Sequence, residues 1–260
     1  MSGEVMAELD GRHVVVTGAG TGIGLAVARR LSRDGANVTL LARDEDRLRA
    51  AASSLAGPTH VAPCDIRQRK AVDGAFGLAV TALGPIHALV AAAGIGGPNA
   101  DGAGDRFDDL VATNLVGTYS CAQAAVRNLA PGPVVRHIVV VSSILARIGV
   151  PGYAGYCASK AGLLGLVRSL AAELGSANVQ VNAICPGWVD TEMAWAGMDG
   201  LAEGSGGTRE DAYRDAMKAV PLGRMSQPDD VAGVVAWLLS ADARGVTGQA
   251  IDQNGGAWMG

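Results

Sequence analysis

Aromatic side chains are scarce in this 260-residue chain, which has four Trp, four Tyr and only two Phe. Charged residues are also few, at 18%, whereas hydrophobic residues make up 49%, so the chain is too apolar to be disordered. A core with so few rings must be built from Ala, Val, Leu and Ile, which suits close packing of helices on a sheet. The formal net charge of −4 argues against a protein that grips nucleic acid.

Disulfide, metal and membrane signals are also missing. The four cysteines form no CxxC pair and no zinc-type Cys/His spacing, and we expect reduced thiols at Cys64, Cys121, Cys157 and Cys185. Residues 1–10 lack the basic-then-apolar order of a signal peptide, so a cytoplasmic protein is expected. The uncharged stretch Gly74–Ala100 is interrupted by Gly84-Pro85 and His87, which favours a helix end and a strand over a membrane span.

Apolar runs alternate with helical patterns along the whole chain. Strands are expected at Arg12–Thr17, Asn37–Ala42, Thr59–Cys64, His87–Ala93, Val135–Ser142, Val179–Ile184 and Gln249–Ile251. Helices are expected after the first glycine turn, after Asp44, at Gln68–Leu83, Asp108–Leu129 and Tyr153–Leu174, and from about Arg209. Near-continuous apolar strands between helices predict an α/β fold, a single-domain Rossmann-type doubly wound parallel sheet of about seven strands with helices on both faces, over residues 1–260.

One compositional break interrupts this order. The segment Gly197–Gly207 reads GMDGLAEGSGG and lies between the sixth predicted strand and the helix near Arg209. Ligands bind such sheets at the carboxyl ends of the strands, so residues 191–225 are interpreted as a lid insertion over the ligand. A surface loop without a role is an equally good interpretation.

A glycine-rich turn follows the first predicted strand and opens a helix. It comprises Thr17, Gly18, Gly22, Ile23 and Gly24 in the pattern TGxxxGIG. A turn without Cβ atoms lets a pyrophosphate reach backbone N–H groups at a helix N-terminus. The strand before it and the helix after it supply the context that dinucleotide binding requires.

The end of the second predicted strand bears on the choice of cofactor. An NAD site places an acidic side chain there, on the ribose 2′-hydroxyl, whereas this chain has Ala42 followed by Arg43. An arginine can pair with a 2′-phosphate through its planar fork, so Arg43 favours NADP(H). The alternative is NAD(H), with Arg43 solvated and Asp44 on the ribose.

Tyr156 and Lys160 lie four residues apart in a predicted helix and therefore on one face of it. A phenol has a pKa of about 10, and lowering it to about 7 requires roughly 4 kcal/mol of stabilisation of the phenolate. An ammonium about 4 Å away supplies about that much at an effective dielectric constant near 20. Tyr-x-x-x-Lys is therefore a candidate general acid/base for alcohol and ketone chemistry.

Ser143 directly follows the fifth predicted strand, 13 residues before Tyr156, so its hydroxyl is expected to face the same crevice. With the glycine turn, these residues make the chain resemble the short-chain dehydrogenase/reductase family, in particular its 3-oxoacyl-thioester and polyketide ketoreductases. The resemblance runs from about Asp10 to Gly256. It implies that Ser143 hydrogen-bonds the substrate oxygen, Tyr156 transfers the proton, Lys160 holds the nicotinamide ribose and Asn114 anchors a water in a proton relay.

The resemblance also implies further cofactor contacts. They are an adenine contact at Asp65, backbone beside the cofactor at Gly94, a turn at Pro186-Gly187, the N–H of Val189, and the hydroxyl of Thr191 on the nicotinamide carboxamide. One position departs from the family pattern. Ala91-Ala92-Ala93-Gly94 stands where Asn-Asn-Ala-Gly is common, so the side-chain hydrogen bonds of those asparagines are missing.

The substrate pocket is expected to contain Ile144, Leu145, Tyr153, Trp188, Met193 and Trp195. A 3-oxoacyl thioester or polyketide-like ketone is one candidate substrate. Family members that dock acyl carrier protein commonly have an Arg where this chain has Ser176-Ala177-Asn178, which favours the alternative of a free, bulky secondary alcohol. A non-catalytic nucleotide-binding protein is a third reading, disfavoured by the presence of both Tyr156 and Lys160. The family resemblance implies a homotetramer, and no metal, nucleic acid or membrane partner is expected.

Overall fold

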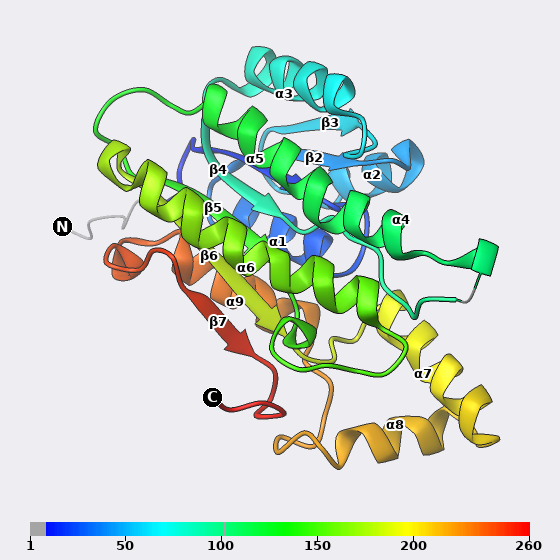
Figure 1. Ribbon diagram of the computed structural model, residues 1–260. Helices are drawn as coiled ribbons and strands as arrows, with labels where there is room; N and C mark the ends of the chain where they lie inside the picture. The colour runs from blue at the N-terminus through cyan, green and yellow to red at the C-terminus, as the bar shows by residue number, and fades with distance from the viewer. Residues whose placement is uncertain (1–8, 101) are drawn as a thin grey trace.

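The computed structural model describes residues 9–100 and 102–260. In this part of the chain seven strands form one sheet in the order β3-β2-β1-β4-β5-β6-β7, and each neighbouring pair is parallel. The strands are β1 (His13–Thr17), β2 (Asn37–Ala42), β3 (Thr59–Pro63), β4 (Ile86–Ala91), β5 (Arg136–Val141), β6 (Val179–Pro186) and β7 (Ala250–Gln253). Strand order reverses between β1 and β4, which confirms the predicted Rossmann-type sheet (Figure 1).

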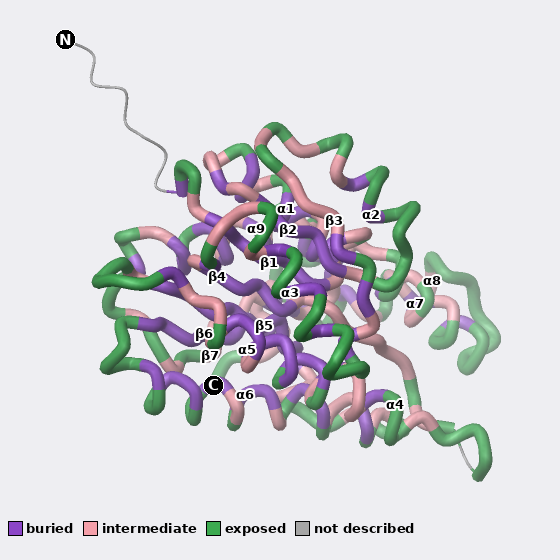
Figure 2. The backbone as a smooth tube through the Cα atoms, turned by 90° about the horizontal axis from the view of Figure 1, so that it is seen from above, coloured by how far each residue is buried: buried purple, intermediate pink, exposed green. Residues whose placement is uncertain are grey.

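Helices cover both faces of the sheet, and alternate residues of each strand separate the two cores. Val14 and Val16 face α1 (Gly22–Arg33), α2 (Glu45–Ala52) and α9 (Pro228–Leu238). Val15 faces α3 (Arg69–Leu83), α5 (Thr118–Arg127) and α6 (Ala154–Leu174). Figure 2 shows the buried strands running between these layers. Short 3-10 turns are η1 (Gly102–Gly104), η3 (Ile144–Ala146), η4 (Gly175–Ala177) and η5 (Ala241–Ala243).

The helix predicted over Asp108–Leu129 is interrupted. α4 (Phe107–Val111) passes into a π-helical segment, η2 (Ala112–Gly117), before α5 begins at Thr118. A Cβ on Gly117 would lie 2.7 Å from the Ile66 side chain, so the widened turn lies close to the β3–α3 connection. Residue spacing cannot reveal such a turn, because one inserted residue leaves the flanking helical pattern readable.

The glycine-rich segment Gly197–Gly207, which was predicted to be a lid or a surface loop, is mostly helical. α7 (Glu192–Ser205) runs through it and ends at Gly206, which adopts a left-handed φ of 69°. Its buried Ala194, Met198 and Ala202 recur every four residues and pack against α8 (Arg209–Met217). The two helices form an arm beside the sheet (Figure 1), here called the α7–α8 arm. Among residues 9–100 and 102–260, no helix has the length and apolarity that crossing a bilayer requires.

Candidate active site

The residues predicted to carry chemistry meet at the carboxyl ends of β1, β4 and β5, beside the reversal of strand order. Thr17 at the end of β1 pairs with Ala91 of β4, which in turn pairs with Val140 of β5. The loops that leave these three strands therefore start side by side. One of them is the glycine turn, and another begins at Ser143.

The glycine turn has a shape that side chains would fill. Gly18 and Gly22 have φ values of 69° and 54°, in the left-handed region that favours glycine. A Cβ on Gly18 would lie 2.8 Å from the backbone N of Ala93, and one on Gly24 would overlap the carbonyl oxygen of Gly18. Thr21 precedes α1 without a side-chain cap, so the first N–H groups of the helix are left for an anion. This cradle fits a dinucleotide pyrophosphate.

Two hydrogen bonds hold the chain where the family's asparagines are replaced by alanine. The hydroxyl of Thr17 accepts the N–H of Ala93 at 3.1 Å. Two residues later, the N–H of Ile95 donates to Oδ1 of Asn114 at 2.8 Å. The backbone after β4 is thus tied to β1 and to η2 without the missing side chains.

Asn114 lies in the π-helical segment and is fully buried. Its Nδ2 donates to the carbonyl of Ile95 at 3.0 Å and to Oγ of Ser159 on α6 at 3.0 Å. A Cβ on Gly94 would lie 3.1 Å from Asn114 Oδ1 and 3.4 Å from Lys160 Nζ. Gly94, Asn114 and Lys160 are therefore neighbours, as a shared site requires.

Lys160 is 5% exposed, and its ammonium donates to the carbonyl of Val141 at the end of β5 over 2.9 Å. The hydroxyl of Ser142 donates to the backbone carbonyl of Lys160 at 2.9 Å, which joins the same strand end to α6 a second time. Burial lowers the pKa of Lys160 to about 8. The amine can therefore gain and lose a proton near neutral pH.

Tyr156 projects from the first turns of α6, and its ring centre lies 5.7 Å from Lys160 Nζ. Burial raises the pKa of the phenol, while its hydrogen bond to Ser143 opposes that rise. The expected lowering of the Tyr156 pKa by Lys160 is absent, because desolvation is the largest influence on the phenol and Lys160 is not among the groups that shift its pKa. Ser143 lies close enough to Tyr156 to act on the pKa of its phenol, as the 13-residue spacing predicts, and the catalytic role of the pair stays a prediction.

Arg43 is exposed at the end of β2, as the NADP(H) prediction requires. The carboxylate of Asp65 already has a partner. It accepts hydrogen bonds from Nε and Nη2 of Arg67 at 3.0 and 2.7 Å. This hydrogen bond to Arg67, followed by the charges of Arg67 and Arg43, holds the pKa of the Asp65 carboxyl below its ordinary value. Asp65 would therefore contact adenine while it stays paired with Arg67, and this ion pair forms without the cofactor.

The turn after β6 approaches the last strand closely. A Cβ on Gly187 would lie 3.0 Å from Cα of Asn254, and Pro186 ends β6. Val189 is buried and pairs with Ser226 in an isolated bridge. The hydroxyl of Thr191 caps α7 by accepting the N–H of Ala194 at 3.3 Å. A Cβ on Gly22 would lie 3.2 Å from Thr191 Cγ2, which brings the start of α7 to the glycine turn.

The predicted pocket residues divide between two places. Ile144 is buried, whereas Leu145 and Tyr153 are half-buried near Ser143 and the start of α6. Met193 is 48% exposed, and a Cβ on Gly96 would lie 2.9 Å from its Sδ and 3.7 Å from Cε2 of Tyr156. Met193 therefore faces Tyr156 across Gly96.

The two predicted pocket tryptophans pack within the α7–α8 arm. Trp195 stacks on Tyr213 with ring centres 5.7 Å apart, and its Nε1 donates to Asp190 at 2.6 Å. Trp188 contacts the same cluster, and Cζ3 of its ring would lie 3.2 Å from a Cβ on Gly197. Both rings therefore pack inside the α7–α8 arm and contribute to its stability without any substrate.

Sequence patterns did not reveal the residues that hold this site in place. Ser159 links Asn114 to the carbonyl of Tyr156, and its position one residue before Lys160 was the available clue. Asn99 accepts the N–H of Gly155 at 2.8 Å and so fixes the start of α6. No pattern marks Asn99, because its partner is 56 residues away.

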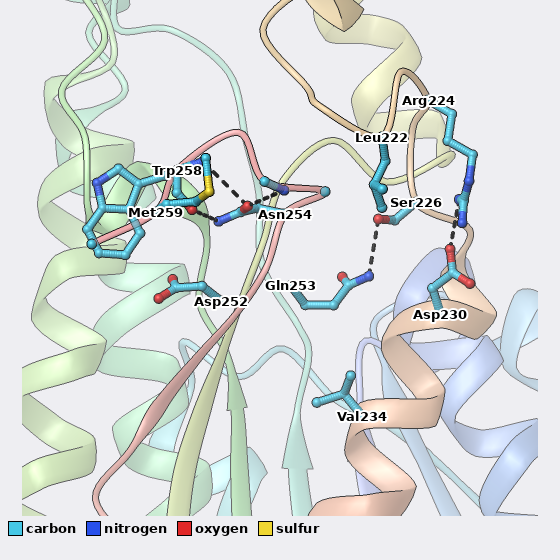
Figure 3. Close-up of a pocket in the computed structure, with 13 residues that line it drawn as sticks. Leu222, Arg224, Ser226, Asp230, Val234, Asp252, Gln253, Asn254, Trp258 and Met259 are labelled. Carbon is cyan, nitrogen blue, oxygen red and sulfur yellow. Dashed lines mark hydrogen bonds and ion pairs between the residues drawn. The ribbon is translucent and has the colours of Figure 1, made fainter.

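A hollow of about 620 Å³ lies elsewhere, between the loop at Leu222–Ser226, α9 and the C-terminal residues (Figure 3). Gln253 donates to Ser226 at 3.1 Å inside it, and Arg224 pairs with Asp230 at its edge. Its lining includes neither Tyr156 nor Lys160. Within the described residues, no group of three or more His, Cys, Asp or Glu side chains is arranged to hold a metal ion.

Comparison with known proteins agrees with this geometry. Residues 18–257 match the family model adh_short_C2, described as enoyl-(acyl carrier protein) reductase. The 3-oxoacyl-(acyl-carrier-protein) reductase MabA of Mycobacterium tuberculosis is 35% identical over 96% of this chain and 94% of its own length. The chain belongs to the short-chain dehydrogenase/reductase family. It is therefore an oxidoreductase, as the sequence predicted.

Other members of the short-chain dehydrogenase/reductase family show the same likeness. The short-chain reductase protein NovJ of Streptomyces niveus is 36% identical over 93% of this chain and 92% of its own. The crystal structure of a variant of actinorhodin polyketide ketoreductase with NADPH has a TM-score of 0.89 and 33% identity, covering 95% of this chain and 97% of that one. The sheet and its helices are therefore those of the short-chain dehydrogenase/reductase family.

Proposed function

We propose that this protein is an NADP(H)-dependent ketoreductase that interconverts a ketone and a secondary alcohol, with Tyr156 as the general acid/base. The observation that carries the proposal is the placement of Tyr156 beside both Ser143 and the buried Lys160. Asn114 and the glycine turn complete the arrangement at the same edge of the sheet. Its relatives include a 3-oxoacyl-(acyl-carrier-protein) reductase and a polyketide ketoreductase with NADPH.

The bound nicotinamide would supply the hydride, and the chain would control the proton. Ser143 would hold the substrate oxygen, because its side chain lies beside the Tyr156 phenol. The raised pKa of Tyr156 keeps the phenol protonated at neutral pH, so it is ready to donate to the oxygen of a ketone undergoing reduction. Lys160, with a pKa of about 8, can lower the cost of the phenolate when it is charged.

The cofactor would lie across the reversal of strand order. Its pyrophosphate would fit the cradle of Gly18, Gly22 and Gly24, where Cβ atoms would collide with backbone at Gly18 and Gly24 and would press on Thr191 at Gly22. Its 2′-phosphate would pair with the exposed Arg43. Thr191 or the N–H of Val189 would meet the nicotinamide carboxamide, and Asp65 the adenine.

For the substrate we propose a 3-oxoacyl thioester or a polyketide-like ketone. Met193 presents apolar surface to Tyr156 across Gly96, and Ile144, Leu145 and Tyr153 would line the rest of the approach. A free bulky secondary alcohol is the second candidate, favoured by Ser176-Ala177-Asn178 in place of the arginine that carrier-protein docking commonly uses. Residues 191–225 would act as the lid over either substrate.

We also propose a cytoplasmic homotetramer. All four cysteines are free thiols, as a reducing compartment would keep them. Exposed apolar side chains on the middle helices, Val116 and Tyr119, would be covered by neighbouring subunits. Sedimentation analysis of the purified protein tests the tetramer directly.

Substitution Tyr156→Phe tests the chemistry. It should lower kcat for ketone reduction by about 10²–10⁴-fold, the usual contribution of a general acid. The Kd for NADPH should change little, because the glycine turn is untouched. The matched control is Tyr119→Phe on the exposed face of α5, which should turn over normally. Retained turnover in Tyr156→Phe would overturn the mechanism, and NADPH binding without turnover of any ketone by the native protein would favour a non-catalytic role.

A further inference from the structure

The first turn of α7 touches three separate parts of the site through three consecutive residues. Thr191 approaches Gly22 in the glycine turn, and Met193 approaches Gly96 beside Tyr156. Between them, Glu192 reaches across to α2, where its Oε2 lies 3.1 Å from Nη1 of Arg47. The start of α7 thus lies against the proposed cofactor cradle.

Arg47 is adjacent to the glycine turn. Its Cβ would lie 3.3 Å from a Cβ on Gly20, and its backbone N–H donates to the capping Asp44 at 3.0 Å. Its guanidinium lies between two carboxylates, with Nε 3.6 Å from Asp44 and Nη1 on Glu192. The Arg47 side chain is 52% exposed and that of Glu192 is 74% exposed, so both can move without repacking a core.

The ion pair of Arg47 and Glu192 differs from the others of the arm. Arg209 pairs with Asp199 within the arm, and the pairs made by Arg214 and Lys218 lie within α8 or at its end. Among the ion pairs between described residues, only that of Arg47 with Glu192 joins the α7–α8 arm to α2. A group that displaced Glu192 from Arg47 would therefore remove this electrostatic tie.

The position of Arg47 specifies which group that would be. The ribose 2′-position of a dinucleotide lies at the carboxyl end of β2, where Arg43 is exposed one helical turn before Arg47. A phosphate there carries more charge than one carboxylate and can accept both arginines at once. Glu192, by contrast, would repel it.

We propose that Arg47 is a second arginine for the 2′-phosphate of NADP(H), together with Arg43, and that Glu192 occupies it until the cofactor binds. This inference rests on the proposed function for the identity of the cofactor. The 2′-phosphate replaces the carboxylate of Glu192 on Arg47, and α7 loses its ion pair with α2. Arg47 would therefore have two effects. It would select NADP(H) over NAD(H), and its exchange of Glu192 for the phosphate would free the start of α7 from α2.

The test measures dissociation constants by isothermal titration calorimetry with NADPH, NADH and adenosine 2′,5′-bisphosphate. Arg47→Ala should weaken NADPH and the bisphosphate about ten-fold, the size expected for one charge-assisted hydrogen bond. It should leave NADH within two-fold. Glu192→Gln should tighten NADPH about two- to five-fold, as expected when an exposed competing ion pair is removed. The matched control is Arg49→Ala, because Arg49 pairs with Glu45 on the same helix.

Each outcome bears on one proposal. Equal weakening of NADPH and NADH by Arg47→Ala would overturn the assignment to the 2′-phosphate, and so would an effect no larger than that of Arg49→Ala. Weaker NADPH binding in Glu192→Gln would overturn the competition. If the native protein prefers NADH, the proposed cofactor itself fails. If the native protein prefers NADPH, and Arg43→Ala abolishes that preference whereas Arg47→Ala does not, the proposed cofactor stands and the role of Arg47 fails.

Discussion

Single glycines set the shape of the cofactor cradle, and Gly24 has the least space. A Cβ there would overlap the carbonyl oxygen of Gly18, which belongs to the same turn. Gly24→Ala should therefore shift the turn and cost about 1–3 kcal/mol in the free energy of unfolding, the usual cost of overpacking. The Kd for NADPH should rise about ten-fold or more as N–H groups leave their positions. Thermal unfolding and titration with NADPH measure the two effects.

Gly74→Ala is the control for Gly24→Ala. Gly74 is exposed in the middle of α3, and a Cβ there meets nothing within 4 Å. This substitution should stabilise the protein by about 0.5–1 kcal/mol, because it removes backbone freedom from the unfolded chain. If both alanines changed the unfolding temperature alike, the close approach of Gly24 to Gly18 would not be the cause.

At the level of residues, short-range spacing identified the candidate catalytic side chains and missed the residues that hold them in place. Tyr156 and Lys160 share a helix, and the 13-residue separation placed Ser143 against Tyr156. The pairing of Arg47 with Glu192 spans 145 residues. Such contacts depend on how α2 and α7 pack in three dimensions, which no local pattern encodes. The direction of the Tyr156 pKa shift failed for the same reason, since burial is a property of the folded chain.

At the level of elements, the strands were predictable and the interruptions were not. All seven apolar runs are strands within a few residues of their predicted ends, because strands buried on both faces leave a continuous apolar pattern. The π-helical segment around Asn114 was hidden inside one long helical pattern. α7 was missed because its glycines outweighed the four-residue recurrence of Ala194, Met198 and Ala202.

The α7–α8 arm depends on Trp195 for its internal packing. Trp195→Ala removes the stack with Tyr213 and the hydrogen bond to Asp190, which together contribute roughly 1–3 kcal/mol. Trp195→Phe keeps a ring against Tyr213 and removes only the hydrogen bond. Limited proteolysis between residues 192 and 217 should be fastest in the alanine variant and intermediate in the phenylalanine variant. Cleavage at the native rate in Trp195→Ala would show that other contacts hold the arm.

At the level of the whole molecule, the end of the sheet opposite the site is sensitive to acid. His13, His87 and His137 lie at or near the amino ends of the adjacent strands β1, β4 and β5. Burial lowers the pKa of all three, and the charge of Arg12 lowers those of His87 and His137 further. Protonation would place cations inside the fold, without a carboxylate among the causes acting on these rings.

His137 has the largest consequence, because it is 4% exposed and its pKa falls to about 4. The unfolded chain binds this proton below about pH 6.5 and the folded chain only below about pH 4. Stability therefore falls as the pH drops from 6.5 to 4, and between pH 7 and pH 5 this one group accounts for about 2 kcal/mol. His137→Gln should reduce the loss of unfolding free energy over that interval by about the same amount, measured by urea unfolding at both pH values.

The comparison is internal to each protein, so a constant cost of the His137→Gln substitution cancels. Gln180 lies opposite His137 on β6, and a second amide beside it would keep the position polar but uncharged. An unchanged difference between pH 7 and pH 5 would place the acid sensitivity on His13 and His87 instead. A reduced difference would show that one buried imidazole, 19 residues before Tyr156 in the chain and at the other end of the sheet, sets the lower pH limit at which the active site stays folded.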